Sequence, residues 1–419
     1  MKGPIIVFGG DGYIGWPLAM RLARETNDEV VIADNMSTRL LVRSVHSDSL
    51  TPIRTMAERL RAFRDYFGRD NLVFEPVDVR VPEAVDELIA KYQPRAVVHL
   101  AHQRSAPFSM IDQRHAIYTQ VNNIVGNLNI MFSVVRHVPD AHILKMGSMG
   151  EYGTPNIPIT EGFIEIEYKG RRDRLLFPRM GQSFYHLSKI FDTYNLLLGN
   201  QVYGIRVTDI MQGVVFGTRT YETSKAEELV TRLDFDSTWG TVINKYVVQA
   251  VLLGELLIYG KGRQTRGFLS LYDSINAMVL LLKNPPKEGE YRTVNQLDMI
   301  YDTLTLAEMV AEVAGEFGIK VRLRQVEDPR VEKEEHYYEV EHEVLPSLGF
   351  RREKEMKDVI REIFEDVIKY RARAESMKHL IYPYVRWRTS YVMDNEQFRL
   401  PPEVERPLTR EEILKLAGF

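Results

Sequence analysis

The sequence predicts an α/β protein, with a doubly wound parallel sheet and a smaller, mixed α/β lobe towards the C-terminus. Three observations predict this class. The first third of the chain alternates short apolar runs with helical patterns, which is typical of parallel strands joined by crossover helices. A glycine-rich segment directly follows the first apolar run. Beyond about residue 200 the alternation loosens, and long polar connections separate the apolar runs.

The first five expected strands are short apolar runs at residues 5–8, 30–33, 72–75, 96–100 and 142–146. Helical patterns lie between them, at residues 17–24, 55–66, 82–91 and 117–136. The segment 36–52 is longer than an ordinary α/β connection. We therefore expect a folded insertion or a lid there, which with the next helix spans about residues 36–68.

The second half of the chain predicts fewer regular elements. Apolar runs at residues 205–210, 256–259 and 268–271 indicate strands, and residues 354–374 have the spacing of an amphipathic helix. Prolines near the end of the chain indicate an extended arm that ends in a short helix, at residues 395–419. We divide the chain into a first domain (1–210), a second lobe interleaved with the last strands of the sheet (211–390) and a C-terminal arm (391–419).

Composition excludes several kinds of function. Lys and Arg number 54 against 58 Asp and Glu, and the net charge of −4 gives no electrostatic footprint for nucleic acid or an anionic membrane. The absence of cysteine excludes disulfides, thiolate metal sites and cysteine nucleophiles, and no metal site is expected. No segment approaches the roughly 18 apolar residues of a membrane span, so we expect a soluble, cytoplasmic protein.

The glycine-rich segment has glycines at positions 9, 12 and 15, between the first strand and the first helix. This spacing lets the chain turn tightly, bring backbone N–H groups to a pyrophosphate and pack the helix on the strand. Asp34 ends the second strand, where a carboxylate can bind an adenosine ribose. The alternative, an ordinary turn with a capping Asp, does not explain this order. We expect a Rossmann-type, NAD-binding first domain.

Two side chains bear on the choice of cofactor. Asp34 repels a 2′-phosphate and favours NAD over NADP, whereas Arg39, close by in the sequence, would favour NADP. Asp78, at the end of the third strand, either faces the adenine or caps the helix that starts near Pro82. The sequence leaves both readings of Asp78 open.

A second motif predicts proton and hydride chemistry. Tyr185 and Lys189 are four residues apart, so they share one face of a helix. An ammonium near a phenol favours the phenolate, which can take a proton from a sugar hydroxyl while hydride leaves the same carbon. Ser148, after the fifth strand, could hold that hydroxyl.

In this order the glycine segment, Ser148 and the Tyr-x-x-x-Lys motif resemble the extended short-chain dehydrogenase/reductase family. Longer stretches resemble its nucleotide-sugar branch and, in that branch, the UDP-sulfoquinovose synthase family. They lie at residues 9–13, 103–107, 149–157, 183–189, 264–267 and 329–332. The likeness extends from about residue 4 to about residue 390.

This resemblance implies a cyclic reaction on one bound sugar. NAD oxidises carbon 4 of UDP-glucose, water leaves across carbons 5 and 6, sulfite adds at carbon 6, and the hydride returns. The cofactor ends as it began, so tight retention of NAD is expected. A homodimer formed through a pair of helices is a further expectation from the family.

The chain departs from the family's 4,6-dehydratases, which place an Asp-Glu pair just after the strand-ending hydroxyl residue. Met149 and Gly150 stand there instead, which leaves Glu151 and His186 as the candidate acid/base groups. Met149 is either an apolar wall that restricts water near carbon 6 or a packing residue. Ser148 replaces the Thr of the plant enzymes and keeps the hydroxyl.

The resemblance also implies the residues that bind the ligands. Arg104, in the loop after the fourth strand, is expected to reach substrate or sulfite rather than solvent, and His336 more plausibly neutralises acids than catalyses. The residues expected at the cofactor are Gly9, Asp11, Gly12, Tyr13, Ile14, Gly15, Asp34, Asn35, Arg39, Asp78, Val79, Asn122, Tyr185 and Lys189. Those expected at the nucleotide sugar are Arg104, Ser148, Met149, Tyr185, Gln212, Thr241, Gln264, Thr265, Arg266 and Arg330.

Two other functions compete with this prediction. A UDP-sugar 4-epimerase or 4,6-dehydratase would share the first oxidation and differ afterwards. A non-catalytic, dinucleotide-sensing regulator would share only the fold. The presence of Ser148, Tyr185 and Lys189 together favours an enzyme.

Overall fold

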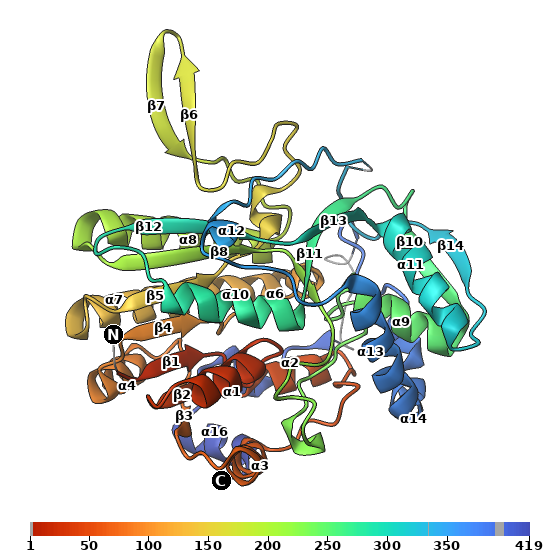
Figure 1. Ribbon diagram of the computed structural model, residues 1–419, viewed down its shortest axis with the longest axis horizontal. Helices are drawn as coiled ribbons and strands as arrows, with labels where there is room; N and C mark the ends of the chain where they lie inside the picture. The colour runs from red at the N-terminus through yellow and green to blue at the C-terminus, as the bar shows by residue number, and fades with distance from the viewer. Residues whose placement is uncertain (1–2, 334, 390–397) are drawn as a thin grey trace.

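The computed structural model describes residues 3–333, 335–389 and 398–419. Its centre is a sheet in the order β12-β8-β5-β4-β1-β2-β3, and all neighbouring strands are parallel (Figure 1). The strands are β1 (Ile5–Phe8), β2 (Val30–Asp34), β3 (Leu72–Pro76), β4 (Ala96–His99), β5 (His142–Met146), β8 (Arg206–Gln212) and β12 (Tyr291–Gln296). The predicted fold class is confirmed. The winding reverses between β1 and β4, where such sheets bind ligands.

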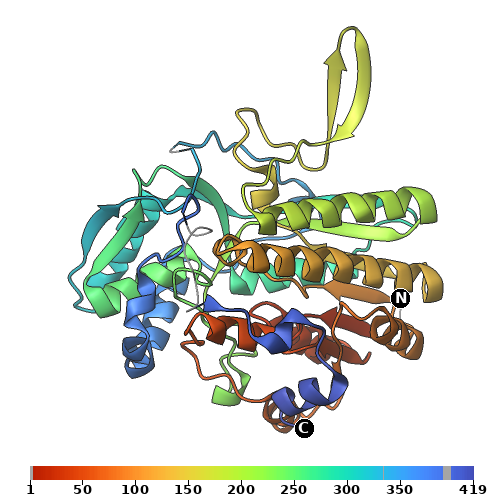
Figure 2. The same ribbon diagram turned by 180° about the vertical axis from the view of Figure 1, so that it is seen from behind.

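Helices cover both faces of this sheet, so its strands are apolar on both sides. Ile5 and Val7 of β1 pack with α1 (Gly15–Glu25) and α10 (Leu271–Lys283) on one face. Ile6 and Phe8 pack on the other face, with α4 (Pro82–Tyr92), α7 (Gly126–His137) and α8 (Phe184–Tyr203). Figure 2 shows α7 and α8 side by side on this second face.

The helix predicted at residues 117–136 is interrupted by a π-helical turn. The structure has α6 (Gln113–Gln120), then η1 (Val121–Val125), then α7. The wider turn places Asn123 inside the protein, where its amide donates to Ser188 Oγ at 2.8 Å and accepts from Gln103 N at 2.8 Å. Such turns often occur at functional sites, and this one carries Asn122 to the cleft described below.

The predicted insertion forms α2 (Ser37–Ser44), a loop and α3 (Met56–Phe67). Its loop is tied to the second lobe. Ser47 Oγ donates to the Asp236 carboxylate at 2.8 Å, and Leu50 N donates to the Leu233 carbonyl at 2.8 Å. The insertion therefore joins the two lobes.

The second lobe has its own core. Strands β9 (Val214–Phe216), β11 (Thr265–Ser270) and β13 (Met299–Asp302) form one sheet, and β10 (Glu255–Tyr259) pairs with β14 (Arg322–Val326). Its helices include α9 (Val242–Leu253), α11 (Thr303–Glu316), α13 (Met356–Lys369) and α14 (Arg371–Ser376). The helix predicted at 354–374 is thus two helices. Helix α10 and strand β12 follow residue 210 but belong to the first lobe.

Two segments extend from these lobes. A hairpin of β6 (Phe163–Tyr168) and β7 (Arg171–Leu176), which the sequence did not predict, projects from the molecule (Figure 1). The C-terminal arm folds back instead, with α15 (Pro402–Glu405) and α16 (Arg410–Ala417). Arg80 donates to the Val404 carbonyl at 2.8 Å, and Phe419 stacks on Phe74. Residues 391–397 of the predicted arm lie outside the described residues.

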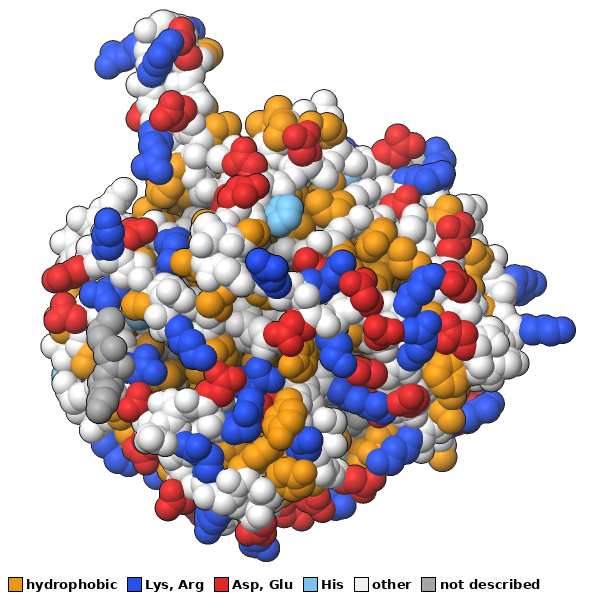
Figure 3. Space-filling view, viewed as in Figure 1, with side chains coloured by type: hydrophobic (Ala, Val, Ile, Leu, Met, Phe, Trp, Pro, Cys, Tyr) orange, Lys and Arg blue, Asp and Glu red, His pale blue; other side chains and the backbone are white. Residues whose placement is uncertain are grey.

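Short turns complete the description: α5 (Ala106–Ser109), η2 (Met149–Tyr152), η3 (Glu227–Leu229), α12 (Val344–Ser347) and η4 (Lys378–Ile381). Within the described residues, no helix has both the length and the apolar character needed to cross a membrane. No cluster of three or more His, Asp or Glu side chains suited to a metal occurs in the same part of the chain. Figure 3 shows basic and acidic side chains interspersed over one face.

Candidate active site

A cavity of about 400 Å³ lies at the carboxyl ends of the central strands and continues against α9, β10 and β11 of the second lobe. That volume is typical of small-molecule sites. Most of the residues predicted at the cofactor and sugar line it. They are Gly9, Gly12, Tyr13, Ile14, Gly15, Asp34, Asn35, Val79, Arg104, Asn122, Ser148, Met149, Tyr185, His186, Lys189, Gln212, Thr241, Gln264, Arg266 and Arg330.

At one end of the cleft, the turn between β1 and α1 is packed too tightly for any side chain. A Cβ atom on Gly9 would lie 2.6 Å from the carbonyl carbon of Leu100, and one on Gly15 would lie 2.1 Å from the Gly9 carbonyl oxygen. Asp34 lies beside this turn and accepts the Asp11 N–H at 2.9 Å. Burial and the nearby Asp11 carboxylate raise the pKa of Asp34 to about 6.

Three residues predicted at the cofactor lie outside the cleft because other side chains bind them. The Asp11 carboxylate accepts from Arg39 at 2.7 Å and from Arg59 at 2.6 Å, so the Arg39 guanidinium is paired outside the cleft. Asp78 is ion-paired with Arg80 at 2.8 Å. Asp78 caps no helix either, because α4 begins after Val81 without a side-chain cap.

Ser148 and Tyr185 meet at the centre of the cleft, as their motifs predicted. A side-chain hydrogen bond from Ser148 favours the phenolate form of Tyr185. Burial acts in the opposite direction and raises the pKa of the phenol above its usual value. The free phenol is therefore held protonated until charge or hydrogen bonds in the cleft change.

Lys189 lies one helical turn beyond Tyr185 and is almost fully buried. Its Nζ atom donates to the Met146 carbonyl at 2.6 Å and lies 5.9 Å from the centre of the Tyr185 ring. Burial and the positive charge of Lys145 lower the pKa of Lys189 to about 7. Near neutral pH this group can therefore hold or release a proton.

His186 faces the same cleft from the first turn of α8. Ser183 Oγ lies 3.0 Å from His186 Nδ1 and fixes the ring. Burial, together with Arg330 and Arg266, lowers the pKa of His186 to about 3. The ring is therefore neutral at physiological pH, binds a proton only weakly and gives it up readily. A Cβ atom on Gly150 would lie 2.2 Å from His186 Nε2, so only glycine leaves room for this ring.

The second-lobe end of the cleft gathers cationic side chains. Arg266 is hydrogen-bonded to Glu332 and His336, and Arg330 lies over the Trp387 ring at 5.9 Å. Lys245 projects from α9 into the same region, where burial and Arg330 lower its pKa to about 8. Guanidinium and ammonium groups gathered in this way suit a phosphate-bearing ligand.

Arg104 marks the boundary between the two lobes. It donates to the Asp234 carboxylate and to the Trp239 carbonyl, and it lies 5.3 Å from the centre of the Trp239 ring. The Thr241 hydroxyl, close by at the start of α9, is buried without a hydrogen-bond partner among the described residues. An unsatisfied hydroxyl in a cavity wall indicates a place for a polar ligand atom.

Comparison with known proteins identifies the family. A model of the NAD-dependent epimerase/dehydratase family matches residues 5–295. UDP-sulfoquinovose synthase of Sulfolobus acidocaldarius is 47% identical over 92% of this chain and 97% of that protein. The chloroplastic UDP-sulfoquinovose synthase of Spinacia oleracea is 40% identical over 92% of this chain and 79% of that protein. The chain belongs to the UDP-sulfoquinovose synthases of the NAD-dependent epimerase/dehydratase family.

Solved structures agree with this fold. UDP-glucose 4-epimerase of Bifidobacterium longum, in complex with NAD⁺ and UDP, superposes with a TM-score of 0.66 at 18% identity, over 87% of this chain and 98% of that chain. UDP-glucose 4-epimerase of Stenotrophomonas maltophila, with bound NAD, gives 0.66 at 18% identity, over 88% and 100%. At such low identity the likeness shows the fold alone.

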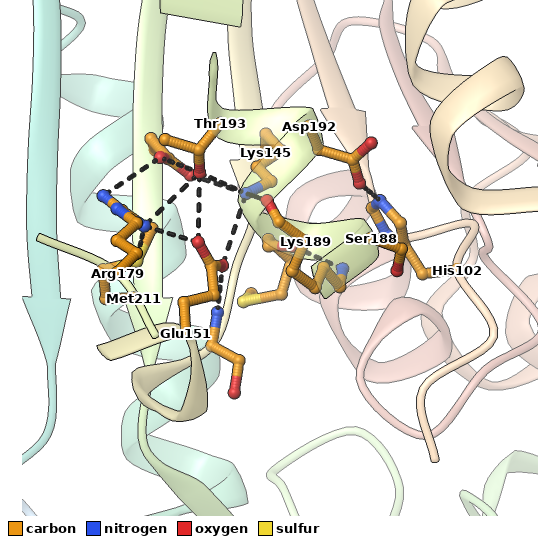
Figure 4. Close-up of polar contacts among 12 residues, drawn as sticks. His102, Lys145, Glu151, Arg179, Ser188, Lys189, Asp192, Thr193 and Met211 are labelled. Atoms are coloured by element: carbon orange, nitrogen blue, oxygen red, sulfur yellow. Dashed lines mark hydrogen bonds and ion pairs between the residues drawn. The ribbon is translucent and has the colours of Figure 1, made fainter. Parts of the chain in front are cut away.

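Besides Asp11, Arg39 and Asp78, two further residues predicted at the site of this UDP-sulfoquinovose synthase family member do not reach the cleft. Glu151 is fully buried behind it and pairs with Arg179 and Lys145 (Figure 4). Because Glu151 does not line the cavity, the structure does not support the expected direct acid/base role. Thr265 lies on β11 outside the cavity, and its carbonyl accepts from Arg266 at 2.9 Å.

Sequence reasoning also missed residues that do line the cleft, including Lys245, Glu332, Tyr338 and His102. Lys245 had a usable signal. It is the only charged side chain in helix α9, which is largely apolar, and a lone cation there needs an anion or a water-filled cavity. Glu332 lies in the stretch 329–332 that resembles the family, whereas His102 and Tyr338 gave no local signal, since the fold alone brings them to the cavity.

Proposed function

We propose that this protein is a UDP-sulfoquinovose synthase, which converts UDP-glucose and sulfite into UDP-6-sulfo-6-deoxyglucose and water. The observation that carries the proposal is the joint presence, on one cleft, of Ser148, Tyr185 and Lys189 with His186 in the space beside Gly150. Ser148, Tyr185 and Lys189 would remove the hydroxyl proton as carbon 4 is oxidised. His186 would provide a base, because this chain lacks the Asp-Glu pair of the dehydratases.

The residues of the cleft fit a bound NAD. The turn at Gly9, Gly12 and Gly15 leaves its face open to a pyrophosphate, at the N-terminus of α1. Asp34 would receive the adenosine ribose and disfavour NADP. Bound in this way, NAD would accept the hydride from carbon 4 and later return it.

The protein's part in the oxidation is to move one proton. Ser148 would hold the carbon 4 hydroxyl, and Tyr185 as phenolate would take its proton as the carbonyl forms. Lys189 as an ammonium would stabilise the phenolate. When the carbonyl is reduced again, Tyr185 gives the proton back.

Water loss and sulfite addition follow at carbons 5 and 6. The new carbonyl acidifies carbon 5. His186, which lines the cleft, would take that proton and pass it to the carbon 6 hydroxyl, which leaves as water. The sulfur lone pair of sulfite then forms the carbon–sulfur bond at carbon 6, and carbon 5 is reprotonated. The proton taken from carbon 5 leaves with the carbon 6 hydroxyl as water, and hydrogen sulfite supplies the proton that returns to carbon 5, so the reaction balances.

Met149 would favour sulfite over water as the nucleophile. Its side chain packs with Tyr152, Phe177 and Met211 in a small apolar cluster and also lines the cleft. An apolar wall offers water no hydrogen bonds. Arg104, Arg266, Arg330 and Lys245 would supply the positive charge for the diphosphate and the sulfonate.

Product analysis tests this function directly. With UDP-glucose and sulfite, mass spectrometry should detect an intact UDP-sugar in which a sulfonate replaces one hydroxyl. Formation of UDP-galactose alone would instead indicate a 4-epimerase, and a stable 4-keto-6-deoxy sugar would indicate a 4,6-dehydratase. No change in the sugar would indicate a non-catalytic dinucleotide-binding protein.

We also propose that the protein is a homodimer. An exposed apolar stripe runs along α8, and a second runs along the neighbouring α6, η1 and α7. Their residues are Phe184, Leu187, Phe191, Tyr194, Leu198, Ile117, Val121, Val125 and Phe132. Two adjacent helices with exposed apolar stripes suit burial against the same two helices of a second copy.

A further inference from the structure

Behind the cleft lies a group of four charged side chains, here called the buried ion cluster: Lys145, Glu151, Arg179 and Asp209. All four side chains are fully buried. Figure 4 shows Lys145, Glu151 and Arg179 close together. Lys145 on β5 and Asp209 on β8 are register partners, and Lys145 Nζ lies 3.0 Å from Asp209. Arg179 is hydrogen-bonded to Glu151. The cluster carries two positive and two negative groups, so its charges are matched.

The first link from the cluster to the cleft runs through Glu151. Its Oε1 atom accepts the Ser148 N–H at 2.9 Å, while Ser148 Oγ accepts the Gly150 N–H at 3.1 Å. These two bonds form a capping box on the turn η2. Because Gly147 has no side chain, Glu151 can pass close to the backbone there: a Cβ on residue 147 would lie 2.6 Å from Glu151 Oε1.

The second link runs through Lys145. Its Nζ atom donates to the backbone carbonyl of Lys189 at 3.2 Å. In return, Lys189 Nζ donates to the carbonyl of Met146, the neighbour of Lys145 on β5, at 2.6 Å. Strand β5 and helix α8 are therefore bound to each other by two lysines in opposite directions.

Thr193 ties these two links together. Its hydroxyl donates to Asp209 at 2.7 Å and lies 3.2 Å from Glu151 Oε2, and it accepts from Lys145 Nζ at 2.9 Å. It lies one turn of α8 beyond Lys189. One hydroxyl thus contacts both the residue that holds Ser148 and the residue that holds Lys189.

We propose that Glu151 and Lys145 are positioning residues, which hold Ser148 and Lys189 at the separation that proton and hydride transfer at carbon 4 requires. The inference rests on the proposed function only for that first step. Because the cluster fixes the positions of Ser148 and Lys189 before the substrate reacts, these groups need no rearrangement in the transition state.

The charge of the buried ion cluster also affects the pKa of Lys189. Burial alone would lower the pKa of Lys145, but Asp209 and Glu151 outweigh it and raise this pKa. Lys145 therefore stays cationic and contributes to the lowered pKa of Lys189. Removal of the Lys145 charge should raise the pKa of Lys189.

The test separates positioning from direct acid/base action by measuring two steps with UDP-glucose in the absence of sulfite. The first is oxidation at carbon 4, followed by the absorbance of reduced nicotinamide with carbon 4 protiated or deuterated. The second is exchange of the carbon 5 hydrogen with deuterated water. The variants are Glu151→Gln, Lys145→Met and the double variant, with Glu161→Gln as the matched control. Glu161 is a partly buried glutamate that accepts backbone N–H groups, away from the cleft.

Positioning predicts that Glu151→Gln and Lys145→Met each slow carbon 4 oxidation roughly 10- to 100-fold. The deuterium isotope effect should rise, while KM for UDP-glucose stays within about twofold. The double variant should lose less than the product of the two single losses, because matched charge is restored. Glu161→Gln should oxidise carbon 4 at the wild-type rate.

The inference is overturned if Glu151→Gln oxidises carbon 4 normally and loses only carbon 5 exchange, because Glu151 would then be an acid/base itself. If either charge variant fails to fold, Thr193→Val decides, since it removes one bridging hydroxyl and leaves no charge unpaired. Thr193→Val should slow oxidation in the same way, and a wild-type rate would contradict the proposal. A crystal structure of Thr193→Val, which is independent of activity, should show Ser148 and Lys189 displaced from Tyr185; unchanged positions would contradict the proposal.

Discussion

His186 and Gly150 occupy one space in the cleft: a Cβ atom on residue 150 would lie only 2.2 Å from His186 Nε2. In the 4,6-dehydratases that the sequence resembles, a glutamate stands at the position of Gly150. A side chain at position 150 would therefore exclude the imidazole from its place in the cleft. In the proposed mechanism, His186 takes the part of the absent Asp-Glu pair in water loss.

Replacement of His186 should separate the two halves of the reaction. His186→Gln is expected to keep carbon 4 oxidation and to lower carbon 5 exchange about 10²- to 10⁴-fold, because a general base is lost. Nuclear magnetic resonance in deuterated water measures that exchange. Gly150→Ala should show the same defect, since its methyl group would displace the ring. Normal exchange in either variant would exclude His186 as the base.

The lowered pKa of Lys245 predicts proton uptake when a diphosphate binds. Above about pH 8 most Lys245 side chains of the ligand-free protein are uncharged amines. A nearby phosphate would favour the protonated form, so binding would take up a proton. Calorimetry of UDP binding at such pH, in buffers of different ionisation enthalpy, should detect the uptake. Lys245→Met should abolish it and weaken UDP roughly 10- to 100-fold. Lys369→Met, on the exposed surface of α13, should do neither. Unchanged uptake in Lys245→Met would place the diphosphate elsewhere.

The pKa of Lys189 predicts how stability depends on pH. The folded value of about 7 lies below the unfolded value of 10.5, so between these values the unfolded chain binds more protons. Stability should therefore rise with pH across this window, with each pKa unit worth about 1.4 kcal/mol. Below pH 7 both states hold the proton and the contribution is constant. Urea unfolding of the cofactor-free wild type and of Lys189→Met measures the difference. A difference that falls with rising pH would contradict the lowered pKa.

The proposed dimer makes a simple prediction about mass in solution. Leu198, 58% exposed on α8, should become a buried contact, and Leu198→Arg should convert the dimer to a monomer. Analytical ultracentrifugation checks this. Leu175→Arg, at an equally apolar exposed position on the projecting hairpin, should remain dimeric. A monomeric wild type, or a monomeric Leu175→Arg, would contradict the proposed interface.

Local patterns predicted the fold and the centre of the site well. Most strands buried on both faces appear in the sequence as short apolar runs. The glycine turn, Ser148 and the Tyr185–Lys189 pair can each be recognised within a single strand, turn or helix. The structure brings all of them to one cleft. These features can be predicted without knowing which residues far apart in the sequence are in contact.

The residues that sequence reasoning misplaced depend on partners far along the chain. The resemblance predicts Glu151 as an acid/base group because Met149 and Gly150 stand where the dehydratases have an Asp-Glu pair. Arg179, 28 residues further along the chain, instead pairs with Glu151 behind the cleft. Asp11 was likewise expected at the cofactor, and Arg59 binds it from 48 residues away. The π turn at Asn122 packs against α8, a contact that the helical periodicity does not reveal.

The most direct test of the account is the product formed from UDP-glucose deuterated at carbon 4, incubated with sulfite. The account predicts a UDP-sugar that carries a sulfonate at carbon 6 and keeps its deuterium at carbon 4, because the hydride is removed and returned within one cleft. Tyr185→Phe should form almost none of it. A sulfonated product that has lost the deuterium, or a product without sulfonate, would contradict the account.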